Sequence, residues 1–430
     1  MPKATQTAKA TPSTSSLEPD ARRKRSAAPK KGGDAATPEA RTVRRPHVTL
    51  VLGAGVSKGL VPDWDALTDA LERRVPEVGF APTKSCDQFP NENQLRLELV
   101  WRAIVDQQRK KAAAKTRGPI GRRMLALERD AERKWIDLLR AELYPSKRHD
   151  ALEPYLSLRR STEPPRRKVD CPATTLSAIV GLLTARDPAP IERVITFNAD
   201  DWLEFELHRS LEFDGFSRRF RVITQPTFGP DAAEYEAESD GRIRPSSRVP
   251  IVHAHGFLCH PSEKACPSYS GKPPNHKRQP SYDAPNMLVF RDLDYWRTVG
   301  NPMSFANHTL LHAMTTSKCI FVGLSFRDIN LLRWAGALTA EHEDTWRRRW
   351  EMHFTDGTER TGSAIHWSKR RNKHVWLTEK VPDHIKAFFA SRDVEVDEVE
   401  WKLVAGERSV AERLRVALGA NPGGTESQGG

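Results

Sequence analysis

The sequence predicts an α/β fold of Rossmann-like type, in which a mostly parallel β-sheet carries helices on both faces. Short apolar runs rich in β-branched residues recur along the 430 residues, as expected of parallel strands buried on both sides. Helical periodicities separate several of these runs. A glycine-rich turn follows the first run directly, and the order strand, turn, helix is typical of nucleotide-binding βα units.

The first βα unit begins at His47. The run His47–Leu52 predicts a buried strand, which ends at the turn Gly53-Ala54-Gly55. Apolar residues then recur at intervals of three and four from Trp64 to Val75, which predicts a helix. Strand, turn and helix therefore occur in the order that a nucleotide-binding unit requires.

A helical insertion is predicted at about residues 80–170. Apolar residues recur at helical spacing through about 92–144. The basic clusters at 109–111 and 122–123 are expected to form a solvated face, and a partner or nucleic-acid surface is the less favoured alternative.

Further strands and helices alternate after the insertion. The predicted strands are Val194–Phe197, Val249–Ala254, Met287–Phe290, Cys319–Gly323 and His374–Leu377. The predicted helices lie at about 176–183, 200–211, 294–314 and 328–340. The polar segment Pro261–Asn286 is expected to be a long loop that covers or borders a site.

The basic charge is concentrated at the start of the chain. Of the formal net charge of +12, residues 1–46 contribute +7, from eleven Lys or Arg against four Asp or Glu. Residues 1–45 have almost no large apolar side chains and are expected to be a disordered tail, as are residues 419–430, leaving one domain at 46–418. The cluster at 22–25 is interpreted as part of a solubilising tail, with an address or a contact to nucleic acid as the alternative.

Composition excludes several classes of protein. A hydrophobic content of 38% excludes wholesale disorder. The sequence has neither the run of about 20 apolar residues that a membrane helix needs nor the apolar stretch of a secretory signal. The five cysteines are odd in number and widely spread, which argues against a disulfide scaffold and fits a reducing cytoplasm.

The turn Gly53–Ser57 has two interpretations of equal weight. Glycines let a backbone approach a pyrophosphate, and Ser57 adds a hydroxyl donor. The alternative is that small residues only allow close helix packing. The later turn Gly323-Leu324-Ser325 follows a strand in the same way, so Gly323 and Ser325 could line the far end of a dinucleotide, while Asp328 could cap the next helix.

Polar residues also follow the second predicted strand. The run Thr196-Phe197-Asn198-Ala199-Asp200-Asp201 should project from the carboxyl edge of the sheet, where open α/β folds bind ligands. Asn198 could hold a hydroxyl or a water, or could only shape the turn. Asp200 could serve the site or cap the helix that begins at Trp202, and Asp201 is favoured as the capping residue.

The run His253-Ala254-His255-Gly256 ends a further strand and is expected to place two imidazoles on one strand face. A zinc site is disfavoured because no Cys-x-x-Cys pair occurs, although Cys259, His260, Cys266 and His276 are near in sequence. His255, before a glycine at the carboxyl end of a strand, is well placed as a general base.

In this order the four motifs resemble those of sirtuin-like NAD-consuming domains, over about Val48–Asn330 with a tail to about 418. The matching residues are Gly53, Ala54, Gly55 and Ser57 with Pro62, Asp63 and Trp64; Thr196, Asn198 and Asp200; His255 with Gly256; and Gly323 with Ser325. The two Cys-x-x-Cys pairs of protein-deacetylating sirtuins are missing, and Phe197 stands where those enzymes have Gln. These departures argue against deacetylation. The runs Asn198–Glu204 and His253–Leu258, together with the helical insertion, resemble the prokaryotic antiviral branch, whose members hydrolyse NAD.

The resemblance implies NAD+ as substrate and no metal. It implies His255 as the base, Asn198 as the group that positions the ribose or water, and Asp200 as a group on the nicotinamide side. Gly53, Ala54, Gly55 and Ser57 would cradle the pyrophosphate, Gly323 and Ser325 would border the adenosine, and Asp63 and Trp64 would belong to a loop over the nicotinamide.

Two alternatives to NAD hydrolysis stay open. Deacylation or ADP-ribosyl transfer to a protein is less favoured without the zinc module. A non-catalytic NAD-binding or nucleic-acid-binding subunit would use the basic tail and the cluster at 347–349. The resemblance also implies regulation by self-assembly or by a sensor partner, such as a HerA-type ATPase or an Argonaute-like protein.

Overall fold

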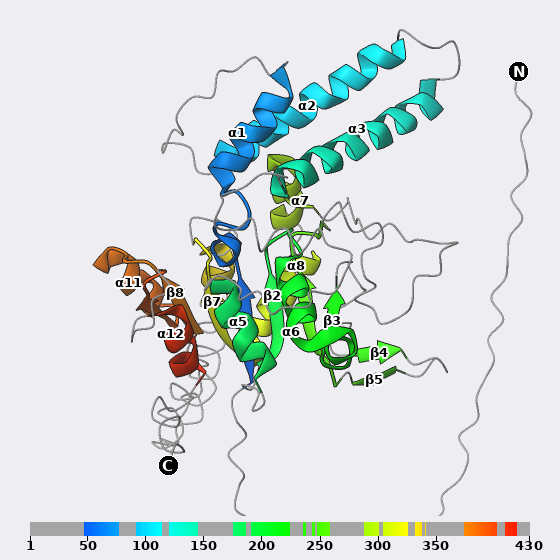
Figure 1. Cartoon of the computed structure of the whole chain (residues 1–430). Helices are drawn as coiled ribbons and strands as arrows, with labels where there is room; N and C mark the ends of the chain where they lie inside the picture. Colours follow the sequence, from blue (N-terminus) through cyan, green and yellow to red (C-terminus); the bar gives the residue numbers. More distant parts are fainter. Residues whose placement is uncertain are drawn as a thin grey trace, which may run out of the picture. The chain divides into compact units, whose positions relative to one another are not determined.

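Figure 1 shows the computed structural model of the chain, which contains an α/β domain. It describes residues 47–76, 92–113, 120–144, 175–185, 191–223, 235–237, 243–245, 247–258, 288–300, 304–325, 332–337, 340, 374–401 and 409–418. Both expected tails, the expected loop at 261–286 and parts of the insertion lie outside these residues.

Seven parallel strands form the central sheet, which confirms the α/β fold with a mostly parallel sheet that the sequence predicts. They are β1 (Val48–Leu52), β2 (Ile191–Thr196), β3 (Phe220–Ile223), β6 (Val249–His253), β7 (Lys318–Val322), β8 (His374–Thr378) and β9 (Val394–Glu398). Their order is β3-β6-β2-β1-β7-β8-β9, and every neighbouring pair is parallel. A separate antiparallel pair joins β4 (Tyr235–Ala237) to β5 (Ile243–Pro245).

The strand order reverses at β1 and β7. The chain passes from β1 to β2 on one side of the sheet, and later crosses from β6 to β7 on the other side. In open α/β sheets, the crevice beyond the carboxyl ends of the strands at such a reversal is where ligands bind. The turns that follow β1 and β7 lie at this point.

Helices cover both faces of the sheet. The helices of the described residues, including those of the insertion, are α1 (Trp64–Arg74), α2 (Glu92–Ala113), α3 (Ile120–Leu143), α5 (Thr175–Thr184), α6 (Trp202–Arg219), α7 (Asp292–Gly300), α8 (Phe305–Thr316), α11 (Asp383–Ala390) and α12 (Val410–Ala417). Residues 332–337 are also helical, and a 3₁₀ helix, η1 (Ala54–Ser57), follows β1.

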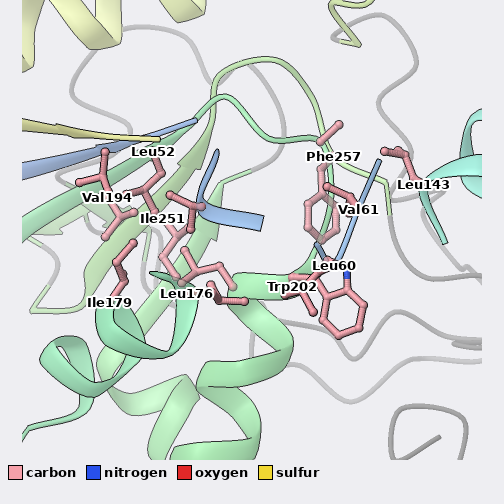
Figure 2. Packing of buried hydrophobic residues seen from close by; sticks show 14 of the residues in the cluster. Leu52, Leu60, Val61, Leu143, Leu176, Ile179, Val194, Trp202, Ile251 and Phe257 are labelled. Atoms are coloured by element: carbon pink, nitrogen blue, oxygen red, sulfur yellow. The ribbon is translucent and has the colours of Figure 1, made fainter. Parts of the chain in front are cut away.

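Alternation along the strands divides the core into two layers. In β1, Leu50 and Leu52 belong to one buried cluster and Val51 to the other. Figure 2 shows the first cluster, where Leu52 lies near residues of α5 such as Ile179. On the opposite face, α8 and α11 supply the helical side of the second cluster. All five residues of β1 are buried, because both faces of the strand are covered.

Helices α2 and α3 lie in the segment where the insertion is expected, and they pack with α1 (Figure 1). The guanidinium of Arg96 in α2 bridges to α1, 2.5 Å from an Asp69 oxygen and 2.6 Å from a Glu72 oxygen. Trp101 of α2 and Trp135 of α3 meet edge to face, 6.4 Å between ring centroids. The exposed basic residues 109–111 end α2 on its solvent side, as predicted.

Several predicted elements differ from the structure. The helix expected at 294–314 is two helices, α7 and α8, because the Ser304 hydroxyl caps a new helix by accepting from the Asn307 amide. Residues 288–290 form no strand; Val289 donates to the His255 carbonyl instead of joining the sheet. Helix α6 continues to Arg219, eight residues beyond its predicted end. Strands β3, β4, β5 and β9 were not predicted. In β9, Glu395 is exposed and Asp397 and Glu398 are half-buried at the sheet edge, so the strand lacks the apolar pattern of a buried one.

Among the described residues, no helix combines the length and apolarity needed to cross a membrane.

Three glycines interlock the turns after β1 and β7. The Gly53 amide donates to the Val322 carbonyl and the Gly55 amide to the Gly323 carbonyl, both at 2.9 Å. A Cβ on Gly323 would lie 2.5 Å from the Val56 nitrogen, and a Cβ on Gly53 would lie 2.6 Å from the Gly323 oxygen. Gly323 also has a φ of +67°, a conformation that favours glycine.

We expect Gly323→Ala to destabilise the protein more than Gly59→Ala. Gly59 has a similar φ of +87°, but a Cβ there would meet nothing within 4 Å. The control should lose about 1 kcal/mol from backbone strain alone, and Gly323→Ala about 1–3 kcal/mol more from overpacking. Urea unfolding of both variants measures the difference, and equal losses would contradict the interlock.

Candidate active site at the carboxyl ends of β1, β2 and β6

Ser57, Asn198 and Asp200 form one hydrogen-bonded unit. The Ser57 hydroxyl donates to Oδ1 of Asp200 at 3.2 Å and accepts from Nδ2 of Asn198 at 3.2 Å. Ser57 ends η1 after β1, whereas the other two residues follow β2. The structure therefore brings together two motifs that lie more than 140 residues apart in the sequence.

Thr196 and Asp200 fix the ends of this short loop. Oγ1 of Thr196 accepts from the Asn198 amide at 3.1 Å, so the threonine shapes the turn. Oδ1 of Asp200 accepts from the Trp202 amide at 3.2 Å and thereby caps α6. The favoured capping role of Asp201 is wrong: it occupies the N-cap position but makes no side-chain capping bond.

Burial raises the pKa of Asp200 to about 6. Desolvation is the main cause, the charges of Asp201 and Glu204 add to it, and the Trp202 amide and His253 oppose it. The carboxyl group therefore begins to take up a proton just below neutral pH. Groups with such shifts gather at functional sites, although structural networks produce them too.

Tyr144, which directly follows α3, ties the insertion to the site. Its hydroxyl accepts from the Asp201 amide at 3.0 Å and lies 2.8 Å from Oδ1 of Asp201 and 2.6 Å from the Leu258 carbonyl. Leu143 belongs to the same buried cluster as Phe257 (Figure 2). The end of α3 thus contacts both the loop after β2 and the segment after β6.

His255 is buried in an aromatic surround. Its ring meets Phe197 edge to face at 4.7 Å and Tyr295 at 5.7 Å between centroids. Only 4% of the residue is exposed, and Nε2 has no hydrogen-bond partner among the described residues. Burial lowers the pKa of His255 to about 3, so the imidazole is neutral throughout the physiological range.

His253 and His255 do not share a strand face, contrary to the sequence prediction. β6 ends at His253, and Ala254 and His255 form a turn, so strand alternation does not reach the second imidazole. The His253 ring lies between Glu204 of α6, 2.7 Å from its Oε1, and the Asn198 carbonyl, 3.1 Å away. His253 therefore lies between two hydrogen-bond acceptors, whereas His255 lies between two aromatic rings.

Close packing accounts for the glycines of the first turn. The amides of Gly53 and Gly55 are engaged by carbonyls at the end of β7. The packing interpretation of the turn therefore describes these two residues, and Ala54 lies between them in η1.

The remaining predicted site residues lie at the borders of this region. Asp63 is exposed and caps α1, accepting from the Ala66 amide at 2.8 Å. Trp64 packs on Phe290, 5.5 Å between ring centroids. Ser325 is exposed two residues beyond Gly323, and Asp328 lies outside the described residues.

No group of three His, Cys, Asp or Glu side chains suited to a metal occurs within the described ranges. Cys259, His260, Cys266 and His276 lie outside those ranges. Sequence reasoning missed Tyr144 and assigned no role to Glu204. A glutamate on the first turn of a buried helix was the available signal, because such a charge needs a partner.

The chain matches no model of a protein family and none of the curated proteins with which it was compared.

We expect the stability of the protein to fall in acid through His255. Its pKa is 6.5 in the unfolded reference and about 3 in the fold, so only the unfolded chain takes up this proton between those values. The neutral imidazole of His255 makes its full contribution to the free energy of unfolding above about pH 6.5. As the pH falls below that value, the free energy of unfolding decreases by about 1.4 kcal/mol per pH unit.

His255→Gln and His255→Leu remove this proton site. Urea unfolding of wild type and variants from neutral pH to about pH 5 measures the effect, and both variants should lose about 2 kcal/mol less than wild type. Parallel curves for all three proteins would contradict the buried neutral imidazole.

Proposed function

We propose that this protein is a sirtuin-like NAD hydrolase that cleaves NAD+ to nicotinamide and ADP-ribose. One observation carries the proposal: Ser57, Asn198 and Asp200 form a bonded unit after β1 and β2, and the buried, neutral His255 packs against Phe197 of the same loop. The unpaired Nε2 of His255 is a further support, because an unsatisfied buried polar atom costs about 1–3 kcal/mol unless a ligand or water meets it.

The reaction needs a base and a placed water but no acid. The bond between C1′ of the ribose and the pyridinium nitrogen breaks, its electron pair stays on nitrogen, and nicotinamide leaves neutral. A water oxygen bonds to C1′, and its proton passes to a base. His255 is assigned as that base because it is already deprotonated.

Substrate binding must also raise the basicity of His255. A pKa of about 3 makes the free imidazole a weak base. A water or ribose hydroxyl at Nε2 would relieve the desolvation that lowers this pKa. Asn198 is assigned to hold that hydroxyl or water, since its side chain is half-buried and anchored by Ser57.

The glycine turns are assigned to the rest of the dinucleotide by close approach. The amides of Gly53 and Gly55 are used within the protein, so these residues would bring the backbone near the pyrophosphate without donating to it. Ala54 and Ser57 would complete this side, Gly323 and Ser325 would border the adenosine, and Asp63 and Trp64 would flank the nicotinamide end.

We infer that the protein is a cytoplasmic antiviral effector, which depletes NAD+ when it is triggered. The observation behind regulation is the tie from Tyr144 to both site loops, through which a change at the helical insertion would reach the site. The trigger would be assembly with further copies or a sensor such as a HerA-type ATPase or an Argonaute-like protein, with nucleic acid at the basic tail as another contact.

We expect purified protein to release nicotinamide from NAD+ without an acylated peptide, over a range of protein concentrations. His255→Ala and Asn198→Ala should each lower kcat by about 10²-fold or more, because a base or its oriented reactant is lost. His384→Ala, an exposed histidine on α11, is the control and should keep wild-type activity. Circular dichroism checks that the variants fold.

A steep dependence on protein concentration would indicate self-assembly as the switch. Binding of NAD+ without release at any concentration would leave a non-catalytic NAD-binding subunit as the function. Failure to bind NAD+ would overturn the proposal altogether.

A further inference from the structure

His253 lies between two hydrogen-bond acceptors. Nδ1 is 3.1 Å from the Asn198 carbonyl, and Nε2 is 2.7 Å from Oε1 of Glu204. A carbonyl oxygen and an ionised carboxylate can only accept. With Glu204 ionised, both ring nitrogens carry hydrogen, and the pair is an imidazolium facing a carboxylate.

This ion pair is sealed from solvent. His253 and Glu204 are each 0% exposed, and Oε2 of Glu204 has no hydrogen-bond partner among the described residues. The second charged group facing the ring is Asp200. Burial alone would lower the pKa of His253, but Glu204, the Asn198 carbonyl and Asp200 outweigh it and raise the pKa.

The same pair completes the anchoring of Asn198. The Asn198 amide donates to Thr196, its side chain donates to Ser57, and its carbonyl accepts from His253. Three elements thus hold one residue at three atoms. Loss of the His253 contact would free the peptide that carries the Asn198 side chain.

We propose that His253 and Glu204 are positioning residues: the buried pair holds the Asn198 peptide so that its side chain is set for the proposed reaction. Neither residue touches the substrate. The inference rests on the proposed function, and it adds two residues that act through Asn198. A buried ion pair is a poor source of stability compared with apolar side chains, which suits a role in geometry better than one in stability.

Two neutral double variants separate positioning from folding. In His253→Asn with Glu204→Gln, the Asn amide takes the place of Nδ1 and can still donate to the Asn198 carbonyl. In His253→Gln with Glu204→Gln, the amide takes the place of Nε2 and cannot. Both remove the buried charges, so both should have similar unfolding midpoints.

We expect the Asn-containing variant to keep kcat within about tenfold of wild type, and the Gln-containing variant to lose about 10²-fold. In both variants, KM for NAD+ should change by less than about threefold, because the turns after β1 and β7 that are assigned to the dinucleotide are untouched. A merely structural role would lower kcat equally in the two. Equal kcat values, with active wild type, would therefore overturn the positioning role and leave the hydrolase proposal standing.

Two readouts do not need activity. Nitrogen-15 NMR of histidine-labelled protein at about pH 7.5, with His253 assigned by its loss in His253→Gln, should show an imidazolium. Hydrogen exchange across residues 197–200 should be faster in the Gln-containing double variant than in the Asn-containing one. A His253 ring without hydrogen on Nδ1, or equal exchange in the two variants, would overturn the inference even if wild type releases no nicotinamide.

Discussion

The close approach of two glycine turns at the reversal of strand order is the constraint on which the site depends. The amides of Gly53 and Gly55 bind the end of β7, which directs the chain after β1 across the top of the sheet. η1 follows at once and ends at Ser57, within hydrogen-bond distance of Asn198 and Asp200 in the loop after β2. A side chain on Gly323 would clash with the backbone at Val56. Both the ends of the strands and the polar cluster therefore require glycine at position 323.

Near these turns the fold shifts the pKa values of neighbouring ionisable groups in opposite directions. His255 lies among aromatic rings and has a lowered pKa, whereas His253, two residues earlier, faces a carboxylate and has a raised one. Asp200 is buried and has a raised pKa. A neutral imidazole, an imidazole with a raised pKa and a desolvated carboxyl group within one short region are the kind of differentiation that acid–base chemistry uses.

Much of the fold could be predicted because the signals are local. The apolar runs of β1 and β7 and the glycines that follow them indicate buried parallel strands and tight turns. The meeting of Asn198 and Asp200 with the first turn could also be expected, because the carboxyl ends of parallel strands share one edge of the sheet.

Other features depend on contacts between distant residues. Which aspartate caps α6 is decided by Tyr144, 57 residues away, which engages Asp201 and leaves Asp200 to accept from Trp202. The partner of His253 is a glutamate on another element, so spacing within the histidine motif could not reveal it. The edge strand β9 has a charged sequence and is defined by its pairing with β8.

The most direct test of the central claim is hydrogen exchange of the His255→Ala protein with and without NAD+, since this variant should bind without turnover. We predict slower exchange in the segments 53–57, 197–200 and 323–325, which the structure gathers at the reversal of strand order. Unchanged exchange in all three segments at saturating NAD+ would contradict the claim that this edge of the sheet is a dinucleotide site.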